Sequence, residues 1–199
     1  MINATNDTIR YISFKYFLEK GYEGTNIRDI CGEVDIKASS LYFYYSSKQE
    51  LFLSLYDEVY GEYLDYLHGI CELSQNTTPK MKLYTLYKKS MEYYTRDLIK
   101  QKFLLRYHLF PPEEVAASIR DKFKFWTNEE NKIIVDIINQ GMERKVIDDS
   151  RTVTEYLNDF KRFCNSQVIE MIIYNTKLSE EEMDKLWIKF WSCTMLNCI

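Results

Sequence analysis

Residues 37–48 carry a dense set of hydrogen-bond donors. No acidic residue lies between Ile36 and Gln49, and the donors recur at short intervals: Lys37, Ser39, Ser40, Tyr42, Tyr44, Tyr45 and Lys48. Side chains of these types bind phosphate oxygens and the edges of bases. The stretch is therefore a candidate nucleic-acid surface.

A helix-turn-helix would position these donors. A first short helix is indicated by Ile27, Ile30 and Cys31, a break falls over residues 32–35, and a second short helix spans about residues 37–44. We expect Leu41 to point inward in this second helix.

Particular side chains then have expected roles at a duplex. Ala38, Ser39, Tyr42 and Phe43 would face the groove, and the small residues at 38–40 would let the helix approach closely. Thr25 is placed to cap the first helix, where a phosphate could also bind, and Arg28 lies one turn further on.

The order of these residues resembles a known family. The pattern consists of Thr25, Ile30, Ile36, Leu41-Tyr42, Tyr44-Tyr45 and Ser47 to Leu51, preceded by Phe17 to Tyr22. It is similar to the DNA-binding domain of the tetracycline-repressor (TetR) family and covers about the first 60 residues. The resemblance implies a regulator, a repressor in this family's usual mode, that binds a palindromic operator as a homodimer and is released by a small apolar or aromatic effector. It also implies phosphate contacts at Tyr42, Tyr44 and Lys48.

The fold expected from this resemblance is all-α, with about nine helices. Residues 1–48 would form a three-helix, helix-turn-helix DNA-binding domain, and residues 49–199 a helical effector-binding and dimerisation domain. The chain departs from the family pattern in the turn, where glycine and serine are common and Asp35 and Lys37 stand here. Aspartate tolerates the left-handed conformation, but lysine cannot cap a helix.

Composition agrees with a helical protein. Three prolines and six glycines in 199 residues leave few turns for a strand-rich fold. The net charge is −4, and residues 1–60 hold six basic and nine acidic side chains. Positive charge must therefore be concentrated on one face if this region binds DNA.

Helix starts and breaks can be placed in the rest of the chain. Ser47 with Glu50, and Ser179 with Glu182, have the spacing of capping boxes. Breaks are expected at residues 74–79, at Pro111-Pro112 and at residues 148–152.

An effector pocket is expected among the aromatic residues that follow residue 55. The candidates are Tyr63, Tyr66, Tyr87, Met91, Tyr94, Phe103, Tyr107, Trp126 and Phe163. Ordinary core packing explains each of them as well. A cationic effector would need a buried carboxylate, for which Glu92, Asp97 and Glu170 are candidates.

In the family, the last two helices of each subunit pair in the dimer. The matching candidates are Phe160, Cys164, Val168, Met171, Ile172, Trp187, Phe190, Trp191 and Met195. Their aromatic and methionine content suits an interface, and it suits a core equally.

Other classes of function have less support in the sequence. Neither His68 nor His108 lies in a recognisable catalytic motif, and the five cysteines lack zinc-site spacing, so we expect no enzyme, cofactor or metal. No signal peptide or membrane span is apparent, which predicts a cytoplasmic protein. The alternative is a helical protein interaction module that keeps the family fold without reading DNA.

Overall fold

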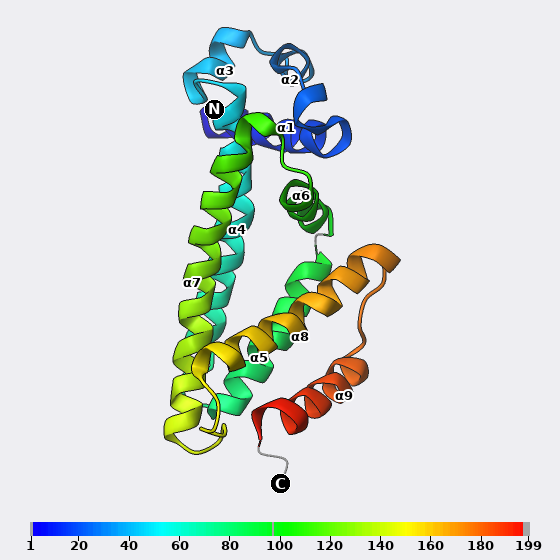
Figure 1. Cartoon of the computed structure of the whole chain (residues 1–199). Helices are drawn as coiled ribbons and strands as arrows, with labels where there is room; N and C mark the ends of the chain where they lie inside the picture. Colours follow the sequence, from blue (N-terminus) through cyan, green and yellow to red (C-terminus); the bar gives the residue numbers. More distant parts are fainter. Residues whose placement is uncertain (1, 97, 197–199) are drawn as a thin grey trace. The chain divides into compact units, whose positions relative to one another are not determined.

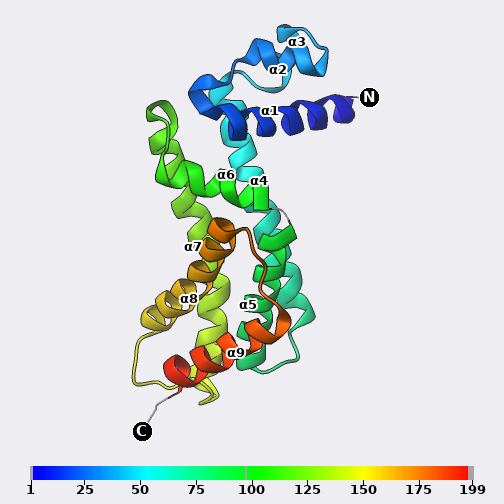
Figure 2. The same ribbon diagram turned by 90° about the vertical axis from the view of Figure 1, so that its right-hand side faces the viewer.

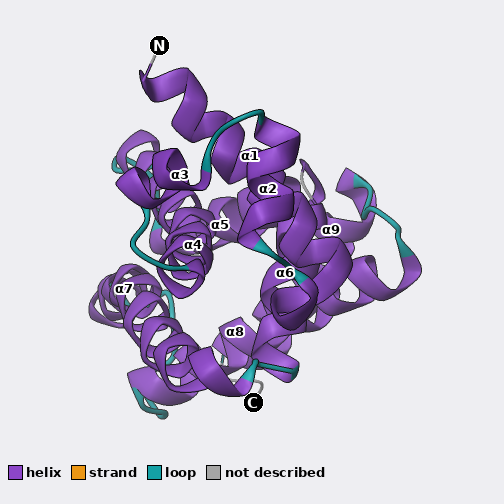
Figure 3. Ribbon diagram, turned by 90° about the horizontal axis from the view of Figure 1, so that it is seen from above, coloured by secondary structure: helices purple, strands orange, loops and turns teal. Residues whose placement is uncertain are grey.

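The computed structural model describes residues 2–96 and 98–196, and these are almost entirely helical (Figure 3). No strand occurs among them, as the sequence predicts. The helices are α1 (Ile2–Gly24), α2 (Ile27–Val34), α3 (Ala38–Tyr44), α4 (Lys48–Leu73), α5 (Pro79–Arg96), α6 (Leu98–Leu109), α7 (Ala116–Glu143), α8 (Val153–Tyr174) and α9 (Glu180–Phe190) (Figure 1). A 3-10 turn precedes α7 and a π-helical turn, Trp191–Met195, follows α9.

The chain divides into two compact units. Unit 1 contains residues 1–61 and 102–124, and unit 2 contains residues 62–101 and 125–199. This is a division by contacts, and the functional boundary between residues 48 and 49 stays a proposal.

In unit 1, α2 and α3 lie on one side of α1 (Figures 1 and 2). The helical path of α1 is broken at Gly21, where φ is 76°. Only glycine adopts this conformation readily, and a Cβ atom here would lie 2.7 Å from Nη2 of Arg106. Gly21 thereby turns the chain toward α2.

The core of unit 1 is an aromatic cluster built from α1, α4 and α6. The Phe52 ring lies edge-on to Phe17, Tyr22 and Tyr107, with centroid distances of 5.1, 5.1 and 4.7 Å. The Tyr107 hydroxyl donates to the carbonyl oxygen of Phe17 at 2.7 Å. Edge-to-face packing adds to the burial of large rings, so this cluster fixes the base on which α2 and α3 rest.

The helix caps of this chain follow from short polar motifs. Ser179 and Glu182 form the predicted capping box of α9. At α4, the Glu50 amide donates to Ser47 Oγ as predicted, but the Glu50 carboxylate accepts from the amide of Ser46 instead of that of Ser47. Only one of the two capping-box hydrogen bonds is therefore made with Ser47, and the other is made with Ser46. A further box, which we did not predict, joins Thr152 and Glu155 at α8.

In unit 2, α5 and α8 lie side by side, and α9 adds aromatic rings to their shared core (Figure 1). Phe163 of α8 stacks on Phe190 at 4.3 Å, and Tyr87 of α5 stacks on Trp187 at 6.0 Å. Leu98 begins α6. Within residues 2–96 and 98–196, no helix is long and apolar enough to cross a membrane.

Candidate nucleic-acid interface

The first helix of the helix-turn-helix begins at Ile27, and its cap is Asn26. The Asn26 side chain accepts a hydrogen bond from the Arg28 amide at 2.9 Å. The prediction that Thr25 caps this helix is therefore wrong. Thr25 is 2% exposed, and its hydroxyl donates to the carbonyl oxygen of Gly21 at 2.6 Å. Two adjacent residues can cap here, and the Thr25 hydroxyl is engaged by the carbonyl oxygen four residues before it, which leaves Asn26 as the cap.

The turn between α2 and α3 is made at Asp35. Its φ of 57° and ψ of 48° are left-handed, as expected for aspartate standing in a glycine position. Lys37 occupies the N-cap of α3 and makes no capping hydrogen bond with its side chain, also as predicted. The Lys37 ammonium is thus exposed at the start of α3.

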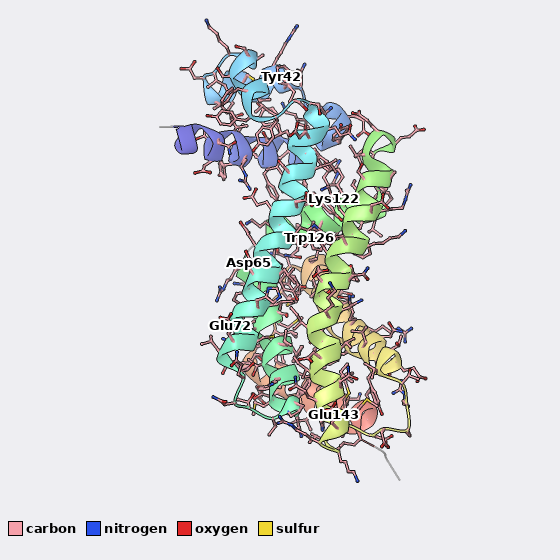
Figure 4. All side chains as sticks on the ribbon, turned by 90° about the vertical axis from the view of Figure 1, so that its left-hand side faces the viewer. Tyr42, Asp65, Glu72, Lys122, Trp126 and Glu143 are labelled. Atoms are coloured by element: carbon pink, nitrogen blue, oxygen red, sulfur yellow. The ribbon has the colours of Figure 1, made fainter. Side chains whose placement is uncertain are left out.

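Helix α3 presents opposite faces to the core and to solvent. Leu41 is fully buried and Tyr45, one turn on, is 8% exposed, so these two anchor the helix. The Tyr45 hydroxyl donates to Asn6 Oδ1 at 2.9 Å, so Tyr45 does not belong to the exposed donors, contrary to expectation. Ser39, Ser40, Tyr42 and Phe43 are exposed, and Ala38 is half-buried. Figure 4 labels Tyr42 on this helix. The predicted inward and outward faces of α3 therefore agree with the observed burial.

Two predicted phosphate ligands lie beside aromatic rings. The Lys48 ammonium lies 4.4 Å from the centroid of the Tyr22 ring, a cation–π contact. Tyr44 is half-buried, and its ring packs edge-on against Phe43 at 5.4 Å. These contacts fix both side chains at the border of the exposed face.

The acidic residues of this region are partly neutralised by α1. Lys15 and Glu33 pair at 3.5 Å, and Lys20 and Asp29 at 3.9 Å. Arg28 and Lys37 are exposed, and neither has an ion pair with any residue the structure describes. An excess of acidic residues in residues 1–60 is thus compatible with a local basic surface at α2 and α3.

A small cavity lies inside unit 2. Its volume is about 20 Å³. Its lining comprises Tyr63, Leu67, Leu86, Ser90, Tyr94, Glu130, Ile134, Phe160, Lys161, Cys164 and Asn165. The Tyr63 hydroxyl lies 3.0 Å from Ser90 Oγ, and Lys161 Nζ lies 3.0 Å from Glu130. Burial raises the pKa of Tyr63, Tyr94 and Cys164. The space suits roughly one water molecule.

The predicted effector residues are only partly brought together. Tyr63 and Tyr94 line the cavity. Tyr87, Met91 and Phe163 belong to the core of unit 2, and Tyr66 and Trp126 pack against Tyr93 and Phe125.

Two of these candidates belong elsewhere. Phe103 and Tyr107 lie in the aromatic core of unit 1 and do not line this cavity. The carboxylate at the cavity is Glu130, whereas Glu92 and Glu170 are not in its lining. Asp97 lies outside the described residues.

A second pocket of about 380 Å³ contains none of the predicted effector residues. It is lined by His68, Cys71, Glu72, Gln75, Lys82, Ile133, Asp136, Ile137 and Gln140. Lys82 donates to Gln140 at 2.9 Å, and Gln140 donates to Asp136 at 2.7 Å. Figure 4 labels Glu72 on α4.

Most of the predicted dimer residues face the core of their own chain. Six of them are no more than 8% exposed: Phe160, Met171, Trp187, Phe190, Trp191 and Met195. Cys164, Val168 and Ile172 are half-buried. The exposed apolar residues of the same C-terminal segment are Ile169, Ile173, Tyr174, Ile188 and Leu196.

No cluster of His, Cys, Asp and Glu able to hold a metal ion occurs in the part of the chain that the structure describes. His108 is enclosed by the hydroxyls of Tyr56 and Tyr60, and burial lowers its pKa to about 4.

The sequence around α2 and α3 is similar to that of known regulatory proteins. The family model "Bacterial regulatory proteins, tetR family" matches residues 13–55, which contain α2 and α3. The chain is 42% identical over 60 residues to the biofilm operon icaADBC HTH-type negative transcriptional regulator IcaR of Staphylococcus aureus strain Newman, covering 30% of each chain. It is 39% identical over 51 residues to IcaR of Staphylococcus epidermidis, covering 26% of this chain and 28% of that one. These matches span less than a third of the curated relatives.

Solved structures resemble the chain over nearly its whole length. The transcriptional regulator FadR from Bacillus subtilis, in complex with stearoyl-CoA, has a TM-score of 0.73 at 15% identity and covers 98% of this chain and all of that one. The fatty acid degradation regulator FadR from Bacillus halodurans has a TM-score of 0.75 at 14% identity, with 98% and 96% covered. At such identities the likeness establishes the fold.

Proposed function

We propose, from the premise that this chain belongs to the tetR family of bacterial regulatory proteins, that it is a transcriptional repressor whose α2 and α3 bind operator DNA. The observation that carries the proposal is the family match over residues 13–55, which coincides with the helix-turn-helix. The negative regulator IcaR, 42% identical over 60 residues, supports repression.

The charge distribution supports contact with a duplex. Lys37 extends from the start of α3, and Arg28 is exposed in the first turn of α2. A duplex presents rows of phosphates beside the major groove, into which a helix of this kind fits. Tyr42, Tyr44 and Lys48 would add phosphate contacts at the border, with Ser39, Ser40 and Ala38 nearest the bases. Thr25 would act by holding the chain at Gly21, because its side chain is buried.

We propose that the repressor is a homodimer. A single seven-residue helix such as α3 offers few contacts, and two copies can occupy half-sites about one helical turn apart. Ile173 and Ile188 are 65% and 66% exposed, and Tyr174 is 72% exposed. Covering such side chains would remove apolar surface from water, which makes α8 and α9 the proposed contact. The half-buried Cys164, Val168 and Ile172 would border it.

We propose that a small apolar or aromatic effector binds in unit 2, at the cavity beside Tyr63 and Tyr94. The FadR of Bacillus subtilis was solved with stearoyl-CoA. In this chain the cavity of about 20 Å³ holds no ligand of that size, so an effector must select a conformation in which the tyrosine rings have moved. Release of DNA would then follow from a population shift, limited by the difference in effector affinity between the two states.

One observation favours a second function. Phe43 is 81% exposed on α3, and the chain carries a net charge of −4. An exposed aromatic ring on an acidic protein suits a protein partner, so the alternative is a helical interaction protein with this fold that does not read DNA.

The deciding experiment measures binding of the purified chain to the DNA upstream of its own gene at two salt concentrations. The Lys37→Ala variant should bind more weakly and lower the slope of log K against log salt by about 0.9 for each lost phosphate contact. Lys132→Ala is a matched control, because Lys132 is an exposed lysine that pairs with Glu129 on α7, outside the proposed DNA and dimer contacts. Absence of any preferred duplex, or equal behaviour of the two variants, would contradict the DNA-binding proposal.

A further inference from the structure

Phe43 is held in an outward position by the residues on either side of it. Leu41 and Tyr45 are buried and anchor α3, and Phe43 lies between them on the opposite face, 81% exposed. Its ring packs edge-on against Tyr44, with an interplanar angle of 87°. Exposure of so large an apolar side chain is unfavourable in water, and its anchoring gives it a fixed direction. A partner surface would contact it directly.

The other side chains of α3 limit what this helix can read. Residues 38–44 are Ala, Ser, Ser, Leu, Tyr, Phe and Tyr, without arginine, lysine, asparagine, glutamine or an acid. The bidentate pairs that distinguish guanine and adenine in the major groove are therefore absent from this helix. A phenylalanine ring has no donor or acceptor, and among the four bases only thymine offers a methyl group on its major-groove edge.

We propose that Phe43 is a specificity-determining residue that packs against the 5-methyl group of a thymine in each half-site. The inference rests on the proposed function and adds the chemistry of the operator. DNA is favoured over a protein as the partner of Phe43 because no acidic residue lies between Ile36 and Gln49, and because Lys37 and Arg28 are exposed nearby. These cations complement phosphates that flank the methyl group.

The test isolates a single methyl group. A preferred duplex is first selected from random sequences with the purified chain, and each thymine is then replaced in turn by uracil. We expect one thymine in each half-site at which this replacement weakens binding about four-fold, as expected for one buried methyl. At the same position, a duplex with a 5-methylcytosine·guanine pair should bind more tightly than one with a cytosine·guanine pair, because 5-methylcytosine restores the methyl group.

Variants assign the effect to one side chain. Phe43→Ala should bind the thymine and uracil duplexes equally, and Phe43→Leu, which keeps an apolar side chain, should retain discrimination. Tyr11→Ala is the matched control, because Tyr11 is an aromatic residue of α1 that is 73% exposed. It should discriminate as the parent does. Circular dichroism and urea unfolding verify that each variant is folded.

The experiment distinguishes failure of this inference from failure of the proposed function. A parent that binds a preferred duplex but ignores every thymine-to-uracil replacement overturns the inference and leaves the repressor intact. Phe43→Ala that still discriminates also overturns it, and if this variant binds every duplex like the parent, Phe43 belongs to a protein contact. A parent that prefers no duplex overturns the proposed function together with this inference.

Discussion

The hydroxyl of Tyr56, on α4, lies 2.6 Å from Nε2 of His108, on α6, and the hydroxyl of Tyr60 lies 2.9 Å from the same atom. Nε2 of the neutral imidazole can accept a hydrogen bond from a tyrosine hydroxyl when the ring proton is on Nδ1. The His108 ring packs against the Phe123 ring at a centroid distance of 4.5 Å and an interplanar angle of 58°. This arrangement favours the uncharged ring.

His108 should make the stability of the chain depend on pH. Burial lowers the pKa of His108 from 6.5 to about 4, so the unfolded chain binds a proton at a higher pH than the folded chain does. Stability is therefore lost as pH falls through this window, by about 3 kcal/mol at full effect. Urea unfolding at pH 7 and pH 4.5 should show a smaller loss for His108→Gln than for the parent. Equal losses would contradict the proposed protonation.

Gly21→Ala should destabilise unit 1. The φ of 76° opposes alanine at a cost of roughly 1–2 kcal/mol, whereas the Arg106 guanidinium, 2.7 Å from the added Cβ, can move aside. Gly24→Ala is the control, because its added Cβ would lie 3.4 Å from its nearest neighbour, Lys20 Cβ. Its effect should stay within about 0.5 kcal/mol. The urea midpoints of unfolding of the two variants are compared. A Gly21→Ala variant as stable as Gly24→Ala would contradict the expected backbone strain at position 21.

Tyr87→Phe should destabilise unit 2 through one buried hydrogen bond. The Tyr87 hydroxyl donates to Oε1 of Gln167 at 2.5 Å, and both residues are buried. Its loss leaves the Gln167 oxygen unpaired, which costs about 1–3 kcal/mol. Tyr84→Phe is matched to it, because Tyr84 donates to Asp184 at a half-buried site. Thermal unfolding should show a clearly smaller shift for this control, and the reverse order would argue against a buried bond.

Cys164 should resist alkylation in the native chain. It lines the small cavity of unit 2, and burial raises the pKa of its thiol, whereas Cys193 is exposed. Thiolate is the reactive form, so iodoacetamide followed by peptide mass spectrometry should find Cys193 modified well before Cys164. An effector that opens the cavity should accelerate modification of Cys164. Equal rates in the absence of effector would show that the cavity is open already.

Local signals predicted most of the helix-turn-helix. The spacing of Ile27, Ile30 and Leu41 gives the inward faces, and Ser179 with Glu182 gives the start of α9. The choice of Asn26 over Thr25 as a cap was missed because both side chains can cap, and what distinguishes them is the break in α1 at Gly21, whose carbonyl oxygen accepts from the Thr25 hydroxyl. The box at Thr152 and Glu155 had the same spacing signal as the others and could have been found.

The cavity could not be predicted from sequence in this way. Buried tyrosines have the same periodicity whether they fill a core or line a space, and Phe103 and Tyr107 prove to fill the core of unit 1. The pair of Glu130 and Lys161 joins α7 and α8 across 31 residues. No local pattern marks such a pair, because its partners become neighbours only when the helices pack.

The sparse exposed charge at α2 and α3 has a consequence for how an operator would be found in a genome. Non-specific attachment to DNA depends on cations, and here Arg28 and Lys37 stand on a chain with a net charge of −4. Such a repressor would spend little time sliding on unrelated sequence and would reach its site chiefly through repeated encounters from solution. The cell would then keep most unbound copies free in solution, where an effector can reach them before they meet DNA.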